Sequence, residues 1–165
     1  MDVIDYINGS LVTAHSMQDI ALAELTDDVA HWQPTGTANS IAQLLAHMVS
    51  AEDRAVNLCI KGGQTLAEQG WGVKTSVPQE RGGFWRKDWT LNIPEFRAYA
   101  KAVQASATEL MASIMPADLD KEVQWFNGPN TAGGLIRMVV INHVLGHCGE
   151  VSALKGMQGL KGLPF

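Results

Sequence analysis

Apolar residues recur at alternating intervals of three and four positions along four long stretches of this chain, and this spacing predicts amphipathic α-helices. The stretches cover residues 4–25, 40–61, 92–115 and 133–156. The stripe of the first stretch contains one polar residue, and its members are Ile4, Ile7, Leu11, Ala14, Gln18, Ala21 and Leu25. Gln18 could face a site or satisfy its amide inside the core.

Capping and stop signals agree with these predicted helices. Ser40, or the residue before it, can cap the second helix, which ends before two glycines. The third helix begins close to Pro94, and Thr131 can cap the fourth. Residues 127–130, with the sequence Asn-Gly-Pro-Asn, predict a turn just before that cap.

The longest connection, residues 62–93, contains six glycines, one proline and four large aromatic residues. It is too long for a tight helix–helix turn, so we expect it to cross one end of a helical bundle, with short helical turns allowed. The aromatic residues either close the core or line a pocket, and they are Trp71, Phe84, Trp85 and Trp89.

No stretch shows the alternation of apolar and polar residues that predicts a strand, and no internal repeat is present. Four long amphipathic helices joined by one long and two shorter connections are typical of a four-helix bundle. The sequence therefore predicts an all-α fold, with a single domain over residues 1–165.

Composition and charge narrow the classes of function. The 12 basic and 17 acidic residues give a net charge of −5, and the basic residues form no cluster, so nucleic acid is not an expected partner. Two cysteines do not suggest a disulfide framework. The first residues lack the pattern of a signal peptide, and no apolar stretch is long enough to span a bilayer. We expect a soluble, cytoplasmic protein with no membrane partner.

Two histidines lie four residues apart in the fourth predicted helix. On an α-helix His143 and His147 share one face, about 6 Å apart along the axis, and two such imidazoles can bind one metal ion. At about 100° per residue, this face also contains Ile136, Val139, Glu150 and Leu154. The pair therefore shares an otherwise apolar face with one carboxylate. Glu150 is the candidate catalytic residue: it could fix a histidine tautomer, act as a general base, or pair with a neighbouring surface charge.

A third histidine, His47, lies at the edge of the apolar stripe of the second predicted helix. Helical bundles assemble metal sites from side chains on facing helices, so His47, His143 and His147 form a candidate set of metal ligands. Three neutral imidazoles leave one or more positions open for water or substrate, which is typical of catalytic sites. Imidazole suits zinc, nickel, copper and iron alike, so the pattern alone does not select the metal.

The remaining polar candidates have weaker patterns. His15 borders the stripe of its helix and His31 lies in a connection, so both are predicted to be structural. Arg54, on the same face as His47, could bind an anionic group of a substrate or form an exposed salt bridge.

Neither cysteine is a candidate ligand. Cys148 points about 140° away from His143 on a helix, and Cys59 lies within an apolar stripe and is predicted to be a small core residue. The sequence also lacks a G-x-G-x-x-G motif, a P-loop and a G-x-S-x-G motif, so nucleotide binding and serine hydrolysis have no local support.

The segments around the three histidines resemble the DinB/YfiT family of DNA-damage-inducible proteins. The matching segments are ANSIAQLLAHMVSAEDR, which contains His47, and NHVLGHCGEVSALKGMQGLKGLP, which contains His143 and His147. The resemblance implies a four-helix bundle of up-down-down-up order, with the long crossover between helices two and three. It also implies a homodimer and a nickel or zinc ion held by these three histidines. Family members of known activity include thiol-dependent S-transferases and isomerases that use mycothiol, bacillithiol or glutathione.

Three hypotheses of function remain open. The first is a metal-dependent enzyme, a thiol-dependent S-transferase or a related hydrolase acting on a small molecule, in which the metal activates a thiol or water. The second is a non-catalytic, metal-stabilised module for binding or stress response. The third is a helical bundle without metal. An open coordination position beside a pocket favours the first hypothesis, and a closed site favours the second.

Overall fold

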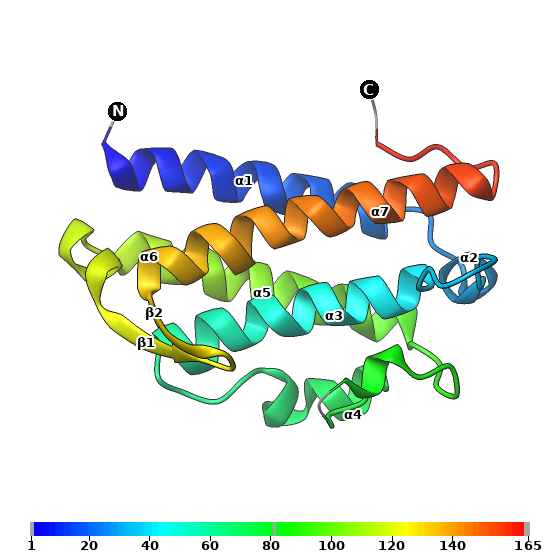
Figure 1. The fold of residues 1–165 in the computed structure, drawn as a ribbon, viewed down its shortest axis with the longest axis horizontal. Coiled ribbons are helices and arrows are strands. Elements are labelled where there is room, and N and C mark those ends of the chain that lie inside the picture. Colours follow the sequence, from blue (N-terminus) through cyan, green and yellow to red (C-terminus); the bar gives the residue numbers. More distant parts are fainter. Residues whose placement is uncertain (1, 81, 164–165) are drawn as a thin grey trace.

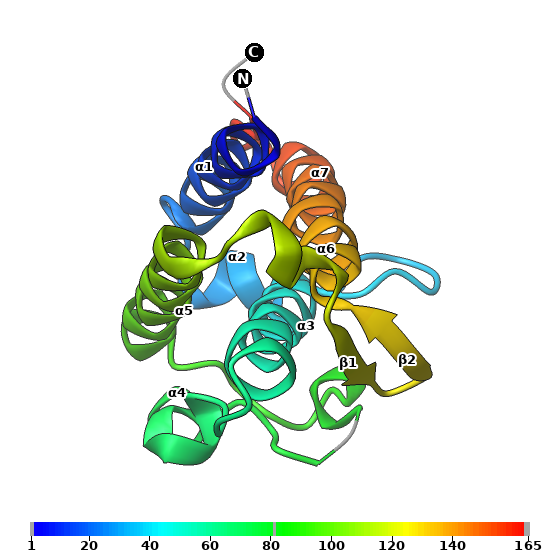
Figure 2. The ribbon, with the colours of Figure 1, turned by 90° about the vertical axis from the view of Figure 1, so that its left-hand side faces the viewer.

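A computed structural model describes residues 2–80 and 82–163 of the chain (Figure 1). Within these residues four long helical segments pack against one another, and two of them contain π-helical turns. They are α1 (Val3–Leu22), α3 (Ile41–Asp53) with η1 (Arg54–Ile60), α5 (Ile93–Ser113), and α6 (Ala132–Leu135) with η5 (Ile136–His143) and α7 (Val144–Met157). Seen along these segments, α1, α7, α3 and α5 surround a common interior (Figure 2). The prediction of a mostly helical fold is confirmed.

The predicted ends of the four long helices agree with the structure to within three residues. A capping box begins α3, because the Ser40 hydroxyl accepts from the Gln43 amide N–H at 3.3 Å and the Gln43 side chain accepts from the Ser40 N–H at 2.8 Å. The Thr131 hydroxyl accepts from the N–H of Gly134 at 3.0 Å and begins α6. Both predicted caps are therefore present.

Shorter elements fill the connections. They are α2 (Asp27–His31), the π-helical η2 (Ala67–Trp71), α4 (Gly72–Thr75), and the 3-10 helices η3 (Gly83–Trp85) and η4 (Pro116–Asp120). Three of them, η2, α4 and η3, belong to the predicted crossover, which lies below α3 in Figure 1. The short helical turns allowed for the crossover are thus observed.

The prediction that the chain has no strand is wrong. Strands β1 (Glu122–Trp125) and β2 (Gly128–Thr131) form an antiparallel hairpin with Trp125 opposite Gly128. The turn therefore lies at residues 126–127, and most of the predicted turn, residues 128–130, belongs to β2. The half-buried side chains Val123 and Trp125 pack on the core, and their alternation with polar residues was the available sequence signal.

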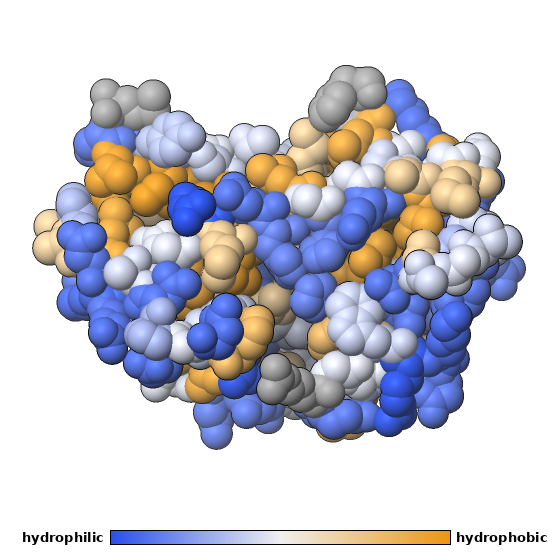
Figure 3. Space-filling model, viewed as in Figure 1, coloured by the Kyte–Doolittle hydropathy of each residue, from blue (hydrophilic) through white to orange (hydrophobic). Residues whose placement is uncertain are grey.

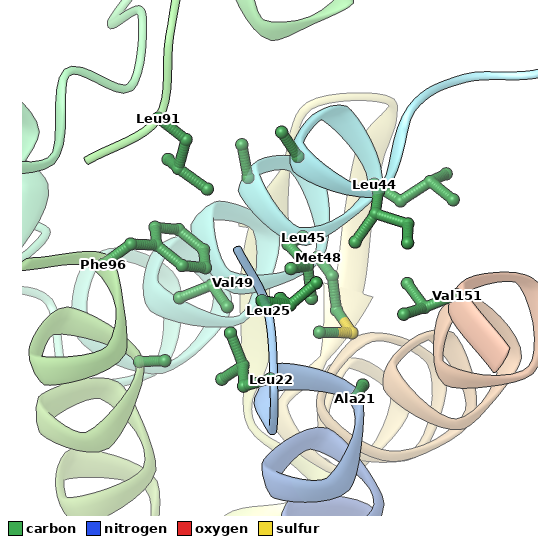
Figure 4. Close-up of a cluster of buried hydrophobic side chains, with 14 of the residues drawn as sticks. Ala21, Leu22, Leu25, Leu44, Leu45, Met48, Val49, Leu91, Phe96 and Val151 are labelled. Carbon is green, nitrogen blue, oxygen red and sulfur yellow. The ribbon is translucent and has the colours of Figure 1, made fainter. Parts of the chain in front are cut away.

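The apolar core consists of two clusters. The larger one joins α3 to the end of α1, to α5 and to α7 (Figure 4), and its labelled members are Ala21, Leu22, Leu25, Leu44, Leu45, Met48, Val49, Leu91, Phe96 and Val151. The second cluster joins Leu11 of α1 to Leu110 of α5 and Leu135 of α6. The interior also contains buried polar residues, and they include His15, Gln18, Glu52, Asp53 and Gln104.

The carboxylate of Asp53, which is fully buried, fixes the first half of the crossover to α3. It accepts hydrogen bonds from Tyr99 Oη at 2.7 Å, from Asn57 Nδ2 at 2.8 Å, and from the N–H groups of Leu66 and Ala67 at 2.9 and 3.0 Å. Four donors offset the desolvation of this charge. Burial and the adjacent Asp53 carboxylate raise the pKa of the Tyr99 hydroxyl, so it remains a donor.

The face on which α3 and α7 lie side by side is hydrophilic in its centre, with hydrophobic residues on either side (Figure 3). Of the helices that the structure describes, none is long and apolar enough to cross a membrane.

Candidate metal centre

The three predicted histidines come together from two helical segments. His47 lies in α3, while His143 ends η5 and His147 lies in the first turn of α7. The Nε2 atom of His143 is 2.9 Å from Nε2 of His47 and 3.0 Å from Nε2 of His147. One ring nitrogen from each of the three residues lies within 4.8 Å of the other two.

The spacing of His143 and His147 depends on where the π-helical turns end. Segment η5 stops at His143 and α7 is regular from Val144, so the two histidines keep the four-residue α-helical spacing. Turns of this wide kind are frequent at functional sites.

The predicted face is only partly a core face. Ile136 and Leu154 are buried, but the two histidines are half-buried and Glu150 is exposed. Ile136 and Val139, which precede His143, are buried as predicted, so the departure from the predicted face concerns Glu150, which follows His143 in the regular helix α7. The result is a site at the edge of the core, open to solvent on one side.

The three nitrogens lack enough protons to hydrogen-bond with one another. A neutral imidazole nitrogen carries either a proton or a lone pair. The Nε2 atom of His143 can therefore form a hydrogen bond with Nε2 of His47 or with Nε2 of His147, but not with both. The Nδ1 atom of His143 is buried and has no hydrogen-bond partner among the residues that the structure describes. A cation shared by the three Nε2 atoms would resolve the conflict between these atoms, although it would leave the Nδ1–H of His143 without an acceptor.

The donor set fits a divalent metal ion. Two of the three nitrogen pairs are separated by 2.9 and 3.0 Å, which is less than twice a metal–nitrogen bond of about 2.1 Å. One ion could therefore contact both nitrogens of each of these pairs. Burial first, and the neighbouring His147 second, lower the pKa of both His47 and His143 to about 4. Both rings are therefore neutral at pH 7, the form that binds metal.

Glu150 contacts the site through His147. Nδ1–H of His147 donates to Oε2 of Glu150 at 2.5 Å, which leaves the lone pair of His147 on Nε2, toward the other histidines. Carboxylates commonly hold metal-binding histidines in this way. Of the three alternatives for Glu150, this contact favours the one in which it fixes the tautomer of a histidine.

Aromatic residues of the crossover cover one side of His47. The ring centroids of Phe84 and Trp85 lie 5.3 and 4.8 Å from that of His47. The amide Nε2 of Gln43 donates to the carbonyl oxygens of Trp85 at 2.9 Å and Arg86 at 3.0 Å. Gln43 and His47 are four residues apart on α3 and therefore lie on the same helical face. This face binds the backbone of the turn at Trp85 and Arg86 and also carries the imidazole ring that the turn covers.

The other polar candidates lie elsewhere. His15 is buried, with Nε2 2.7 Å from Oε1 of Glu52, and Gln18 also donates to Glu52. In His31, Nδ1–H donates to the carbonyl of Asp27 and Nε2 accepts from a backbone N–H. These contacts agree with structural roles for all three residues.

Arg54 and the cysteines are not part of the histidine group. The charge of the exposed Arg54 acts to lower the pKa of Cys59 and of Glu68, so the guanidinium lies near these two residues. Burial raises the pKa of the half-buried Cys59 thiol. Cys148 is buried in the core, where burial first and the Glu52 carboxylate second raise its pKa to about 12.

The fold and the site together define a mostly helical protein with three histidines arranged to be compatible with a divalent metal ion. The sequence profile of the DinB superfamily matches residues 10–151, and the chain belongs to this superfamily. The matched range contains His47, His143 and His147.

A crystal structure of a conserved protein from Enterococcus faecalis has a similar fold. The two structures superpose with a TM-score of 0.78 over 94% of this chain and 96% of that chain, at 18% sequence identity. At this identity the similarity concerns the fold alone. A comparison with curated proteins gives no significant match.

Proposed function

We propose that this protein is a metal-dependent enzyme that transfers a low-molecular-weight thiol to a small electrophilic substrate, with hydrolysis as the related alternative. The supporting observation is the convergence of three half-buried imidazole nitrogens from two helical segments. The DinB superfamily membership supports the choice of thiol chemistry by analogy.

In this proposal the metal is nickel or zinc, and His47, His143 and His147 hold it. A divalent ion supplies Lewis acidity, which makes a thiol or a water molecule nucleophilic at neutral pH. Glu150 is a positioning residue that keeps the lone pair of His147 on Nε2 through the 2.5 Å contact at Nδ1.

We also propose a single domain with the up-down-down-up order of a four-helix bundle, in which the predicted crossover, residues 62–93, joins helices two and three. A homodimer and a cytoplasmic location complete the proposal. The packing of α1, α3, α5 and α7 around one interior and the length of the crossover support this topology.

Metal analysis of the untagged protein tests the proposal. The protein is incubated with nickel or zinc, passed through a desalting column and analysed for metal. We expect one metal ion per chain in the wild type, a loss of at least tenfold in affinity in His143→Ala, and no loss in His31→Gln, the matched histidine control. Equal metal contents in wild type and His143→Ala would contradict the proposal.

A panel of thiols then tests the activity. Mycothiol, bacillithiol and glutathione are each incubated with the metal-loaded protein and an alkyl or aryl electrophile, and loss of free thiol is followed. Thiol consumption that requires metal and His143 supports transfer. A metal-loaded protein that consumes no thiol and hydrolyses no ester supports a non-catalytic module instead.

A further inference from the structure

We propose that the site beside the three histidines binds a substrate with a flat, uncharged apolar group, which lies against an aromatic wall formed by Phe84 and Trp85. This inference rests on the proposed function, because it concerns a ligand bound at the same metal centre. It adds the chemical class of the substrate and two residues that select it.

The wall stands at the edge of the histidine cluster. The Trp85 ring is 4.8 Å from the ring of His47 and packs edge-on to Phe84, also at 4.8 Å. The ring of His47 is also 4.7 Å from that of His143 and 5.0 Å from that of His147. The wall and the other two candidate ligands therefore contact the same imidazole, so a ligand bound at the cluster can also reach the wall.

Trp85 leaves 38% of its surface exposed, although most of the large apolar side chains of the protein are buried. Exposed aromatic area at the edge of a polar site is a usual feature of small-molecule sites, where apolar walls surround a few placed polar groups. A ligand that covers Trp85 gains apolar burial and an aromatic contact together.

Several hydrogen bonds hold the wall in place before a ligand binds. The indole N–H of Trp89 donates to the carbonyls of Phe84 and Arg86 at 3.2 and 3.0 Å, and Gln43 donates to those of Trp85 and Arg86. Three successive carbonyls are thus fixed by two side chains. A wall fixed in advance lowers the entropic cost of binding.

The guanidinium that follows the wall directly is already paired and does not offer itself to an anionic ligand group. Arg86 follows Trp85 directly, but its guanidinium pairs with Glu80 at 2.7 Å and with Asp88 at 2.9 Å. Glu150, on the other side of the cluster, adds negative charge next to His147. An uncharged group therefore fits this surface better than a carboxylate or phosphate.

Three hydroxamates that share one metal-binding group test the inference on cobalt-substituted protein. Acetohydroxamate has a methyl tail, cyclohexanecarbohydroxamate a saturated ring and benzohydroxamate a flat ring. Binding is followed by the cobalt absorption spectrum. Aromatic pairs add about 0.5–1.5 kcal/mol beyond area burial, so we expect benzohydroxamate to bind about two- to tenfold more tightly than the cyclohexane compound.

Trp85→Leu should remove this preference for the flat ring, measured as the ratio of the benzohydroxamate and cyclohexanecarbohydroxamate affinities within the cobalt-loaded variant, so that a general change in cobalt affinity cancels. The control Tyr6→Leu replaces another exposed aromatic residue, on α1, and should keep the preference. Equal affinities for the two rings in the wild type, or a preference that survives in Trp85→Leu, would overturn the inference. An absent cobalt spectrum in the wild type would instead overturn the proposed metal centre, so the two failures are distinguishable.

Discussion

The side-chain amide of Gln43 donates to the carbonyl of Trp85 at 2.9 Å, one helical turn before His47 meets the indole ring of the same tryptophan. Gln43 also accepts from the N–H of Ser40 at the start of α3. One buried side chain thus fixes both the beginning of the helix that carries a candidate ligand and the aromatic turn that covers that ligand.

Gln43→Glu separates these two contacts. The new carboxylate keeps an oxygen for the Ser40 N–H but loses the donors to the carbonyls of Trp85 and Arg86. Buried acceptors left without a partner cost about 1–3 kcal/mol, so we expect the free energy of unfolding in urea to fall by about that amount. Ser40→Ala, which removes only the cap, should cost about 1 kcal/mol. If both variants have the same m-value and Gln43→Glu is as stable as wild type, the contact to the turn contributes nothing.

Replacing Glu150 should change metal affinity through His147. Partners of metal-binding histidines typically contribute 10- to 100-fold in affinity, so Glu150→Ala should bind zinc at least tenfold more weakly in a competition assay with a chromogenic chelator. Glu150→Gln keeps an acceptor oxygen for Nδ1–H and should lose less. Because Glu150 is exposed, the stability of the metal-free protein should change little. Equal affinities for all three proteins would mean that the carboxylate does not position the ring.

The metal-free protein should lose stability in mildly acidic solution. The pKa of His47 and that of His143 are lowered by burial to about 4, whereas the same side chains in the unfolded chain accept protons near pH 6.5. The unfolded state therefore binds more protons between these values, and the stabilisation present above pH 6.5 is lost as the pH falls toward 4. We expect the urea midpoint to decrease between pH 6.5 and pH 5.

The variant His47→Gln/His143→Gln is the control for this effect, since it removes both depressed histidines. Its urea midpoint should change less than that of wild type over the same pH interval. Parallel pH profiles for the two proteins would assign the acid sensitivity to other groups.

The two cysteines should differ in their reaction with iodoacetamide. The half-buried Cys59 should be alkylated slowly at pH 8, because burial raises its pKa and only the thiolate reacts. Cys148 is 1% exposed and its pKa is about 12, so it should react only in unfolding conditions. Peptide mass spectrometry of native and denatured samples distinguishes the sites. Alkylation of Cys148 in native protein at the rate of Cys59 would contradict its burial.

The sequence pattern was sufficient to predict the long helices and to predict that the three histidines lie close together. Helical periodicity is local, and the four-residue spacing of His143 and His147 remains α-helical after η5. Placing His47 with them required only that its helix pack against theirs.

Three features depended on information that the pattern does not carry. The hairpin has strands of four residues, and Gly128 and Pro129 disfavour a strand assignment. The aromatic wall joins positions 47 and 85 through the path of the crossover, which no periodicity fixes. The exposure of Glu150 follows from a site at the edge of the core, whereas a uniform helix predicts an inward face.

The Asp53 carboxylate has a consequence for the order in which the protein assembles. It takes donors from α5 and from the crossover, which lie far apart in the sequence. Until those donors arrive, the charge stays in water, because a lone buried carboxylate is strongly unfavourable. The packing of α3 against α5 is therefore coupled to the position of residues 66–67. The first half of the crossover thus shares its anchor with the core, whereas the aromatic wall in the second half has anchors of its own in Gln43 and Trp89.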